Sequence, residues 1–401
     1  MEFHKQVVRR LENPEYWISY GRQLIDEDDI AAVVTALESS FITTGPAATD
    51  FEKALSRLTG AKHAIVCSNG TAALHLACIG LHVHEHNLGI TSPITFLSSA
   101  NCVEFCKGRV DFVDIDPETL CLSFEKLDDY CRNHEIPKVV IPVDFAGIPA
   151  NLPAIWMLAH KYGFKVIEDA AHSIGSSYQF DGQEYQCGSC THSDAAIFSF
   201  HPVKTITTGE GGAVLTNDDE LANRIRMMRS HGMKRYPDLV HKNEGQWYYE
   251  IEELSSNFRI TDFQCALGLS QLKKLSIFKS RRTEIVRQYN NAFAENPNLI
   301  IPPEPVGSSI CYHLYPLRFV NGASTRNKIF QKLNSYKIHC QIHYIPVYWQ
   351  PYYRDKYYFP TGKCPNAEIY YSQCLSLPLY PALKNDEVDF IIEKILEENL
   401  G

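Results

Sequence analysis

The stretch AAIFSFHPVKTITTGEGGAVL, residues 195–215, places one lysine between two apolar runs. The runs at 195–200 and 212–215 are short and are typical of buried strands. Lys204 stands on the glycine-rich loop between them, with small or apolar neighbours on both sides. A lysine is most often a solvated surface charge, but a desolvated lysine has a lowered pKa, which lets its amine attack a carbonyl and form a Schiff base. The pattern leaves both interpretations of Lys204 open.

Strand-like and helical patterns alternate through the first two thirds of the chain. Apolar runs typical of strands lie at 63–67, 110–113, 139–143, 165–167, 195–200 and 212–215. Most are followed by a helical pattern, as at 71–81, 152–161 and 218–229. Strands that alternate with helices predict a mostly parallel sheet covered on both faces, and ligands of such a sheet bind beyond the carboxyl ends of its strands. We therefore expect the functional residues in the loops after these runs.

The length of 401 residues favours two domains, because one hydrophobic core rarely grows so large. Acidic residues after Asp26 predict the start of a helix, and a second helix is expected at 49–58. A long helix at 261–296 leads through the proline-rich residues 301–305 into a second unit, with strands at 313–320 and 338–345 and a helix between them. We expect a large domain, 1–280, and a small α+β domain, 281–401, against which residues 1–25 can pack.

Composition and charge exclude several classes of protein. A hydrophobic fraction of 45% and a charged fraction of 21% are those of an ordinary globular protein. The net charge of -9 and the absence of a basic run argue against nucleic acid as a partner. Residues 1–11 lack the apolar core of a signal peptide, and no stretch is apolar for long enough to span a bilayer. We expect a cytoplasmic protein with no membrane partner.

The 13 cysteines are expected to be free thiols, because their number is odd and no export signal accompanies them. Most should be small buried residues. Cys187, Cys190 and His192 could form half of a zinc site, but such a pair needs further ligands at suitable spacing and none stands out. We therefore expect no metal.

Two further loops carry candidate residues. Asp169 and His172 follow the strand at 165–167, where Asp169 could serve a cofactor or simply cap the next turn. Gly70 and Thr71 lie where a strand passes through a small-residue turn into a helix, and free amides at a helix start bind phosphate. A glycine at a helix start is also common where no ligand binds, because it marks the turn before the helix. The combination is the stronger signal, since a phosphate cradle, an acid and a lysine lie on three strand ends of one sheet.

The run from Phe198 to Val214 resembles the cofactor-lysine motif of the fold-type-I nucleotide-sugar aminotransferases. The likeness extends over nearly the whole chain, through residues 45–46, 68–74, 168–172, 229–232, 257–259 and 265–268. This resemblance implies an α/β fold like that of aspartate aminotransferase, with a mostly parallel sheet in the large domain and a smaller α+β domain.

The resemblance also implies pyridoxal 5'-phosphate as cofactor, bound covalently to Lys204. Asp169 would pair with the pyridine nitrogen, because a protonated ring withdraws electrons from the substrate. His172 would lie beside the ring and Phe96 would stack on its face. The phosphate would be held by Gly70, Thr71 and Ser199, with Asn257 reaching over from the other subunit of a homodimer with shared active sites.

Residues 20, 40–43, 143–147, 313–316 and 341–344 narrow the resemblance to the aminotransferases of pseudaminic acid biosynthesis. That branch implies UDP-2-acetamido-2,6-dideoxy-beta-L-arabino-hex-4-ulose as acceptor and L-glutamate as donor. The substrate would be met by Tyr20, Ser40, Phe41, Ile42, Thr43, Gln341, Ile342, His343 and Tyr344, beside Gly70, Ser199 and Asn257. The chain departs from the wider family at His172, where many members have glutamine, and at Asp144, where many have histidine.

Three other functions are compatible with such a fold. A sugar 3-dehydratase would have histidine at the position of Lys204, so the lysine argues against that function. A cofactor-binding regulator without catalysis would need a DNA- or partner-binding segment, and the acidic chain shows none. A 4-aminotransferase for a GDP- or dTDP-linked 4-keto-6-deoxyhexose would use identical chemistry and stays open.

Overall fold

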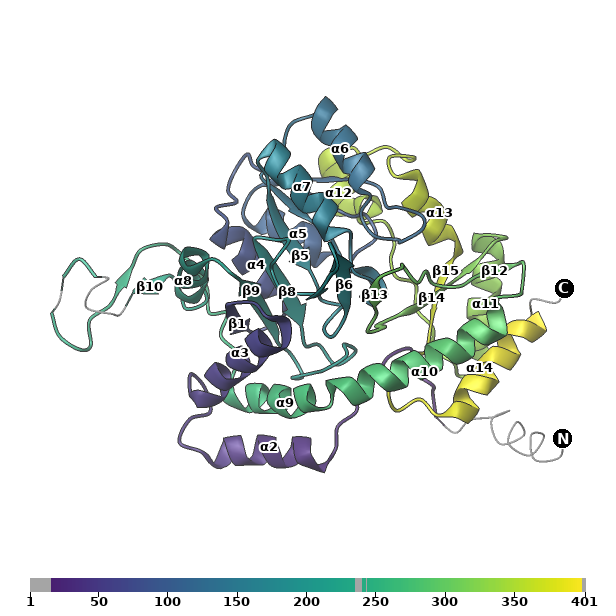
Figure 1. Cartoon of the computed structure of the whole chain (residues 1–401), viewed down its shortest axis with the longest axis horizontal. Coiled ribbons are helices and arrows are strands. Elements are labelled where there is room, and N and C mark those ends of the chain that lie inside the picture. Colours follow the sequence, from purple (N-terminus) through teal and green to yellow (C-terminus); the bar gives the residue numbers. More distant parts are fainter. Residues whose placement is uncertain (1–15, 235–239, 243, 399–401) are drawn as a thin grey trace.

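The computed structural model describes residues 16–234, 240–242 and 244–398 of the chain (Figure 1). Residues 1–11, where we expect no signal peptide, lie outside these ranges. Within the ranges, every helix is too short or too polar to cross a lipid bilayer.

A seven-stranded sheet forms the centre of the protein, in the order β1-β9-β8-β5-β4-β2-β3. Strands β2, β3, β4, β5 and β8 run parallel to their neighbours in this group, whereas β9 runs antiparallel to both β1 and β8. The bounds are β1 (His63–Cys67), β2 (Leu88–Thr91), β3 (Arg109–Phe112), β4 (Val139–Ile141), β5 (Lys165–Asp169), β8 (Ala195–Ser199) and β9 (Gly212–Thr216). The mostly parallel sheet predicted from the sequence is confirmed, and β2 is a strand that the pattern missed.

Helices cover both faces of this sheet because successive strand residues point to opposite sides. On one face, Val139 and Ile197 pack with α4 (Gly70–Gly80), α5 (Ser98–Phe105) and α8 (Asp219–Met228). On the other face, Val140 packs with α6 (Phe124–Asn133) and α7 (Leu152–Tyr162), and Phe198 packs with α3 (Pro46–Thr59) and α9 (Asp262–Lys273). The strands other than the edge strand β3 are buried on both sides almost throughout, as their continuous apolar runs predict.

The single helix expected at 261–296 is wrong: the chain forms α9 and then α10 (Leu275–Phe293), which meet at Lys274. The amine of Lys274 pairs with Asp26 and Asp29, which form the capping box of α2 (Glu27–Glu38). The interruption lets α9 lie beside α2 and α3 while α10 runs on toward the C-terminal part (Figure 1). Helix α10 is continuous through residue 280.

The C-terminal part is built on a three-stranded antiparallel sheet with β14 (Tyr315–Phe319) between β12 (Leu299–Ile300) and β15 (Cys374–Leu377). Around it lie α11 (Ala323–Ser335), α12 (Pro351–Tyr357), α13 (Pro365–Gln373) and α14 (Asn385–Glu398). The strand expected at 338–345 does not form. That segment makes single bridges instead, from Ile338 to Ile18 and from Gln341 to Ser376. Because its two halves pair with different parts of the chain, no continuous ladder forms.

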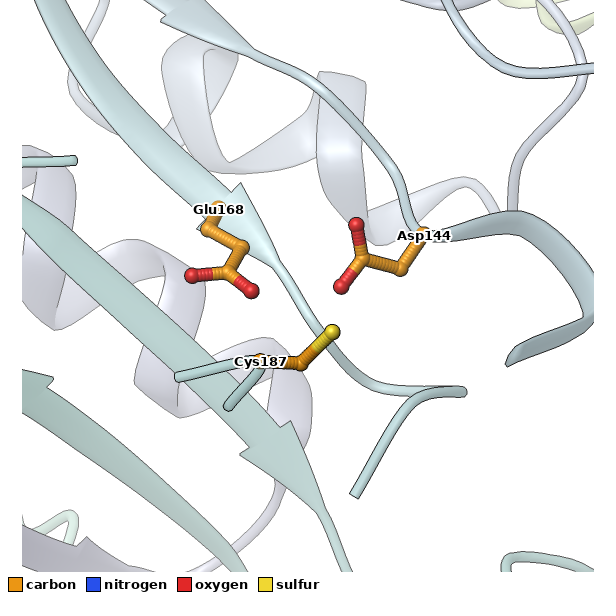
Figure 2. Close-up of side chains that lie close together, drawn as sticks. All are labelled: Asp144, Glu168 and Cys187. Atoms are coloured by element: carbon orange, nitrogen blue, oxygen red, sulfur yellow. The ribbon is translucent and has the colours of Figure 1, made fainter. Parts of the chain in front are cut away.

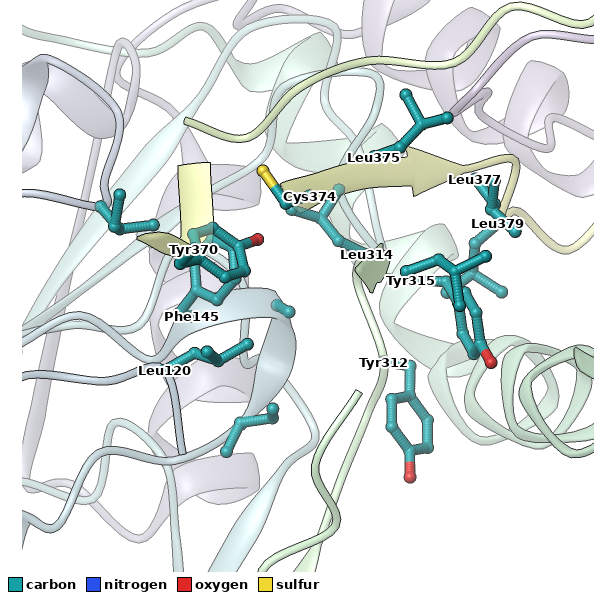
Figure 3. Packing of buried hydrophobic residues seen from close by; sticks show 14 of the residues in the cluster. Leu120, Phe145, Tyr312, Leu314, Tyr315, Tyr370, Cys374, Leu375, Leu377 and Leu379 are labelled. Atoms are coloured by element: carbon teal, nitrogen blue, oxygen red, sulfur yellow. The ribbon is translucent and has the colours of Figure 1, made fainter. Parts of the chain in front are cut away.

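One large core joins the C-terminal part to the central sheet. Figure 3 shows Phe145 beside Tyr370 of α13, and Tyr315 near Leu377 on the neighbouring strands β14 and β15. Ile18 belongs to the same core, so the first described residues pack with the C-terminal part. The remaining strands are β6 (Ser177–Phe180), β7 (Gln183–Gln186), β10 (Met233–Lys234), β11 (Glu250–Ile251) and β13 (Ser308–Ser309).

Candidate active site

A cavity of about 690 Å³ opens at the carboxyl ends of the parallel strands. Asp169 lies at the end of β5, Ser199 at the end of β8, and Gly70 at the start of the helix after β1. Lys204 enters from the loop between β8 and β9. The loops that follow the strands thus meet in one cavity, as expected for a sheet of this kind.

Lys204 projects its amine into this cavity from a loop fixed by its own backbone. Its N–H donates to the carbonyl of His201 at 2.9 Å. Burial lowers the pKa of Lys204 to about 8, against an opposing effect of the Asp169 carboxylate. About a tenth of the amine is therefore in the neutral, nucleophilic form at pH 7, far more than for an ordinary lysine.

Asp169 is held in place by a short chain of hydroxyl groups. Ser99 Oγ donates to its carboxylate at 2.6 Å, and Ser99 Oγ lies 2.7 Å from Thr95 Oγ1. The backbone N–H of Ala171 donates to the other carboxylate oxygen at 3.2 Å. Burial raises the pKa of Asp169, while these two donors favour its charged form. Asp169 thus caps the next turn and at the same time places a positioned acid in the cavity wall.

The start of α4 offers a cradle for an anion. Asn69 caps the helix by accepting from the N–H of Ala72. A Cβ on Gly70 would lie 2.8 Å from Cβ of Ser199, so a side chain there would fill the space in front of the helix. Thr71 Oγ1 lies 2.6 Å from Ser98 Oγ. Free amides, two hydroxyls and the helix dipole make this end of the cavity suited to phosphate.

His172 links the sheet to the C-terminal part across the cavity. Its Nδ1 accepts from the N–H of Ala146 at 3.3 Å, which leaves the proton on Nε2, and Nε2 lies 3.3 Å from the hydroxyl of Tyr344. Burial is the largest cause of its pKa lying well below the usual value, so the ring is neutral. His313 stands 4.4 Å from His172 between ring centroids.

The wall opposite the strands comes from the two ends of the chain. Tyr20 and residues 341–344 line the cavity, which places Gln341, Ile342, His343 and Tyr344 together as predicted. The ring of Tyr20 lies 5.5 Å from that of His343, whose Nδ1 lies 2.9 Å from Ser376 Oγ. Phe96 also lines the cavity and is 57% exposed, with its ring 6.4 Å from that of Tyr344.

The structure does not bring every predicted residue into this cavity. Ser40, Phe41, Ile42 and Thr43 are exposed and lie outside it, so within one chain they do not meet the other substrate residues as expected. The cause is their pairing with the start of α9, where Thr43 bridges to Thr261. Asn257 is also exposed and lies outside the cavity of its own chain.

Several residues that line the cavity were not predicted from the sequence. Ser99 positions Asp169, and His313 packs on His172, but each lies in a different part of the chain from its partner. Leu97, Val203 and Gln350 also line the cavity. A signal for Ser99 was present, because a serine near the start of a helix after a buried strand faces the same edge of the sheet.

The half zinc site considered at Cys187, Cys190 and His192 does not assemble in the described residues. Nδ1 of His192 lies 2.8 Å from the hydroxyl of Tyr178, and Cys190 contacts the carbonyl of Gly188 at 3.6 Å. The side chain of Cys187 instead faces Asp144 and Glu168. All 13 cysteines are free, and twelve are buried, which confirms the expectation of buried thiols.

The arrangement fits a planar, phosphorylated aldehyde. Lys204 offers an amine of lowered pKa, Asp169 offers a buried acid for a cationic ring nitrogen, and the start of α4 offers an anion cradle that a side chain at position 70 would fill. Pyridoxal 5'-phosphate has these three groups.

Comparison with known proteins agrees with this chemistry. Residues 23–396 match the DegT/DnrJ/EryC1/StrS aminotransferase family. The chain is 37% identical to the spore coat polysaccharide biosynthesis protein SpsC of Bacillus subtilis, over 95% of this chain and 96% of that protein. It is 34% identical to UDP-4-amino-4,6-dideoxy-N-acetyl-beta-L-altrosamine transaminase of Campylobacter jejuni, over 93% and 95%.

A solved structure shows the same fold. The aminotransferase PseC of Helicobacter pylori, described as involved in the biosynthesis of pseudoaminic acid, superposes with a TM-score of 0.86 at 30% sequence identity. The match covers 95% of this chain and 99% of that one, so it includes both the central sheet and the C-terminal part. The chain therefore belongs to the DegT/DnrJ/EryC1/StrS family of sugar aminotransferases, has the fold-type-I architecture and uses pyridoxal 5'-phosphate.

Proposed function

We propose that this aminotransferase moves an amino group from L-glutamate to the 4-keto carbon of a nucleotide-linked 6-deoxy sugar. The proposed acceptor is UDP-2-acetamido-2,6-dideoxy-beta-L-arabino-hex-4-ulose, and the product is UDP-4-amino-4,6-dideoxy-N-acetyl-beta-L-altrosamine of pseudaminic acid biosynthesis. The observation that carries the proposal is the single cavity in which Lys204 and Asp169 face Tyr20 and residues 341–344. The chemistry and the sugar wall are thus within reach of each other.

Lys204 has two tasks in this proposal. Bound pyridoxal phosphate supplies an electrophilic carbon and an electron-withdrawing ring that carries the amino group between the two substrates. The amine of Lys204 anchors the cofactor and, when released, holds and moves a proton at Nζ. Its lowered pKa of about 8 suits both tasks near neutral pH.

Asp169 and His172 would orient the ring between them. The carboxylate of Asp169, fixed by Ser99 and Ala171, would hold the pyridine nitrogen in its protonated form. His172 is neutral and has its proton on Nε2, so it would lie beside the ring as a directed hydrogen-bond donor. Phe96 would stack on the ring, and Gly70, Thr71 and Ser199 would hold the phosphate.

The C-terminal part would close over the sugar. We assign 1–280 to the large domain and 281–401 to the small domain, with the segment near Tyr20 packed on the small one. Within the cavity wall, Tyr20 and the side chains of Gln341, His343 and Tyr344 are polar or aromatic, and a few such groups in an apolar pocket fix the orientation of a ligand. The narrower choice of a UDP-linked sugar is supported by the 34% identity to the Campylobacter transaminase.

The active unit in this proposal is a homodimer with shared sites. Asn257 and Ser40–Thr43 are exposed, and the surface at Ser40–Thr43 adjoins the start of α9, because the N–H of Asp262 donates to the carbonyl of Ile42. Phe41 and Ile42 are each more than half exposed on it, which is typical of a surface that another subunit covers. A second subunit would present Asn257 to the phosphate and Ser40–Thr43 to the sugar.

Mixed dimers test the shared site. Lys204→Ala and Asn257→Ala subunits, each of low activity alone, are expected to recover about a quarter of the wild-type activity when mixed in equal amounts. The reason is that half of the dimers are hybrids, and each hybrid has one site with both residues intact. The measurement is glutamate-dependent amination after dissociation and reassociation, with Lys204→Ala mixed with itself as the control. No recovery, or a fully active monomer in sedimentation, contradicts the shared site.

A panel of 4-keto sugars tests the acceptor. With L-glutamate as donor, the UDP-linked L-arabino sugar is expected to be aminated at least about tenfold faster, in kcat/KM, than a GDP- or dTDP-linked 4-keto-6-deoxyhexose. Mass spectrometry of the aminated product is the measurement. Faster amination of a GDP- or dTDP-linked sugar would transfer the proposal to that 4-aminotransferase reaction, which is the second candidate function.

A regulator that only binds the cofactor is the alternative from another class. It would bind the cofactor at Lys204 and show no amination of any sugar in the panel. The 690 Å³ cavity, with space beyond the lysine, favours an enzyme with a substrate.

A further inference from the structure

Two buried carboxyl groups lie directly behind the active site. Asp144 precedes the turn η1 (Phe145–Gly147), and Glu168 is the neighbour of Asp169 on β5. Figure 2 shows both carboxyl groups pointing toward each other and toward Sγ of Cys187. The facing carboxylate oxygens and Sγ of the three side chains lie within 4.8 Å of one another. Asp144 is 0% and Glu168 1% exposed.

Two carboxyl groups whose oxygens lie this close in a buried site are not both ionised near pH 7, because like charges there are not screened by water, so the pair holds one proton. Asp144 accepts from Ser173 Oγ at 2.6 Å and from the N–H of Ala150 at 2.9 Å. Glu168 accepts from the N–H of Gly188 at 2.9 Å. The two donors to Asp144 favour its charged form, which leaves the proton on Glu168.

Among the residues that the structure describes, the titratable groups that face the pair supply no compensating cation. Asp169 on β5 is a further acid, and its charge adds to the burial that raises the pKa of Glu168 well above the ordinary value. The other titratable groups that face the pair are the thiols and phenol of Cys121, Cys187, Cys190 and Tyr178. Burial raises the pKa of each of these groups, so all four are neutral near pH 7.

The turn after Asp144 connects the pair to the cavity. The N–H of Asp144 donates to the carbonyl of Asp169 at 3.1 Å. Ala146 has a left-handed φ of 61°, which the turn must hold against its steric cost. Its N–H donates to Nδ1 of His172, and its carbonyl accepts from the N–H of His313 at 2.8 Å. One residue thus fixes the tautomer of His172 and attaches the C-terminal part.

We propose that Asp144 and Glu168 are a proton-sharing pair of positioning residues, whose single proton holds the 144–147 turn against β5 and thereby fixes His172 and His313 in the cavity wall. The shared proton follows from the geometry of the pair alone. Only its effect on turnover rests on the proposed function.

Glu168→Gln tests the proton. The amide keeps an N–H donor for Asp144 but cannot titrate. At pH values above the ordinary pKa of glutamate, Glu168 is ionised in the unfolded wild type but protonated in the folded one, so folding takes up one proton. The contribution of this group to the free energy of unfolding is therefore greatest at low pH and falls as pH rises. We expect this proton to make the unfolding constant of the wild-type holoenzyme rise about tenfold per pH unit, and Glu168→Gln to remove that component from the pH dependence of the thermal midpoint.

Infrared spectroscopy gives a second reading of the same proton. The carbonyl band of a protonated carboxyl group is expected in the wild-type holoenzyme near pH 7 and should disappear in Glu168→Gln. Glu104→Gln is the matched control, because the carboxylate of Glu104 is also buried but is paired with Lys356. That variant should keep the band and the pH slope. An unchanged band and slope in Glu168→Gln would overturn the shared proton, as would one bound metal ion per chain that this substitution releases.

Turnover tests the positioning role. Glu168→Gln should keep kcat within about twofold, whereas Glu168→Ala, which removes the donor, should lower it at least about tenfold and move the limb of the pH profile that reports His172. Wild-type kcat and pH profile in Glu168→Ala would overturn this role. The infrared band and the pH dependence of the thermal midpoint are measured without substrate. Both therefore still test the shared proton if the proposed sugar amination is wrong.

Discussion

Lys204→Ala is expected to abolish amination, with a loss of at least about 10³-fold in kcat, because one amine serves as both anchor and proton carrier. The purified wild type should be yellow, and borohydride should fix the cofactor on the peptide that contains Lys204. The amine faces the cavity, so its removal should leave the fold unchanged, and the cofactor-free forms of the variant and the wild type should have nearly the same thermal midpoint. Steady-state kinetics, mass spectrometry of the reduced peptide and thermal unfolding are the three measurements.

Lys53→Ala is the matched control for that result. Lys53 lies on the exposed side of α3, paired with Asp50, and should keep full activity. If Lys204→Ala turns over at the wild-type rate, or if borohydride marks another lysine, the assignment of the cofactor lysine is wrong.

Asp169→Asn is expected to keep the fold and part of the cofactor but to lower kcat by about 10²- to 10³-fold. The amide oxygen can still accept from the N–H of Ala171 and the amide N–H can donate to Ser99 Oγ, so the geometry of the wall is preserved. What is lost is the negative charge that keeps the ring nitrogen protonated. Kinetics and the visible spectrum of the bound cofactor are the measurements.

Asp219→Asn separates a general loss of negative charge from this effect. Asp219 is exposed and pairs with Lys62 and His63 on the surface, and it does not line the cavity. Its variant should retain wild-type kcat. Near-normal turnover in Asp169→Asn would reduce Asp169 to a structural residue.

The sheet was predictable because its strands are short apolar runs bounded by turn residues. The predicted runs at 63–67, 195–200 and 212–215 agree with β1, β8 and β9 to within a residue. The helix of 261–296 was overestimated because no glycine or proline marks its interruption at Lys274. That interruption depends on tertiary contacts with Asp26 and Asp29, which local periodicity does not contain.

The three chemical groups of the cavity were also predictable, because Gly70, Asp169 and Lys204 follow strand ends and strand ends meet. The contacts of Ser99 with Asp169 and of His313 with His172 were not, since they join segments far apart in the chain. The position of Ser99 after a strand end signalled only that it lies at the same edge of the sheet. The segment 338–345 has a strand-like pattern, yet it is shared between Ile18 and Ser376 and forms no strand. The placement of Ser40–Thr43 outside the cavity likewise depends on pairing with Thr261.

Twelve of the thirteen cysteine thiols are buried, and Cys106 is partly exposed. The buried thiols can therefore report local opening of the structure through their reaction with a thiol reagent. A thiol-specific alkylating reagent reaches a buried sulfur only while the surrounding structure is open. Buried thiols lie on both faces of the central sheet and in the C-terminal part, as with Cys78, Cys265 and Cys374. When opening is fast compared with alkylation, the rate at each position measures the free energy of opening of that region. Local stability can therefore be mapped on the natural sequence without introducing a label.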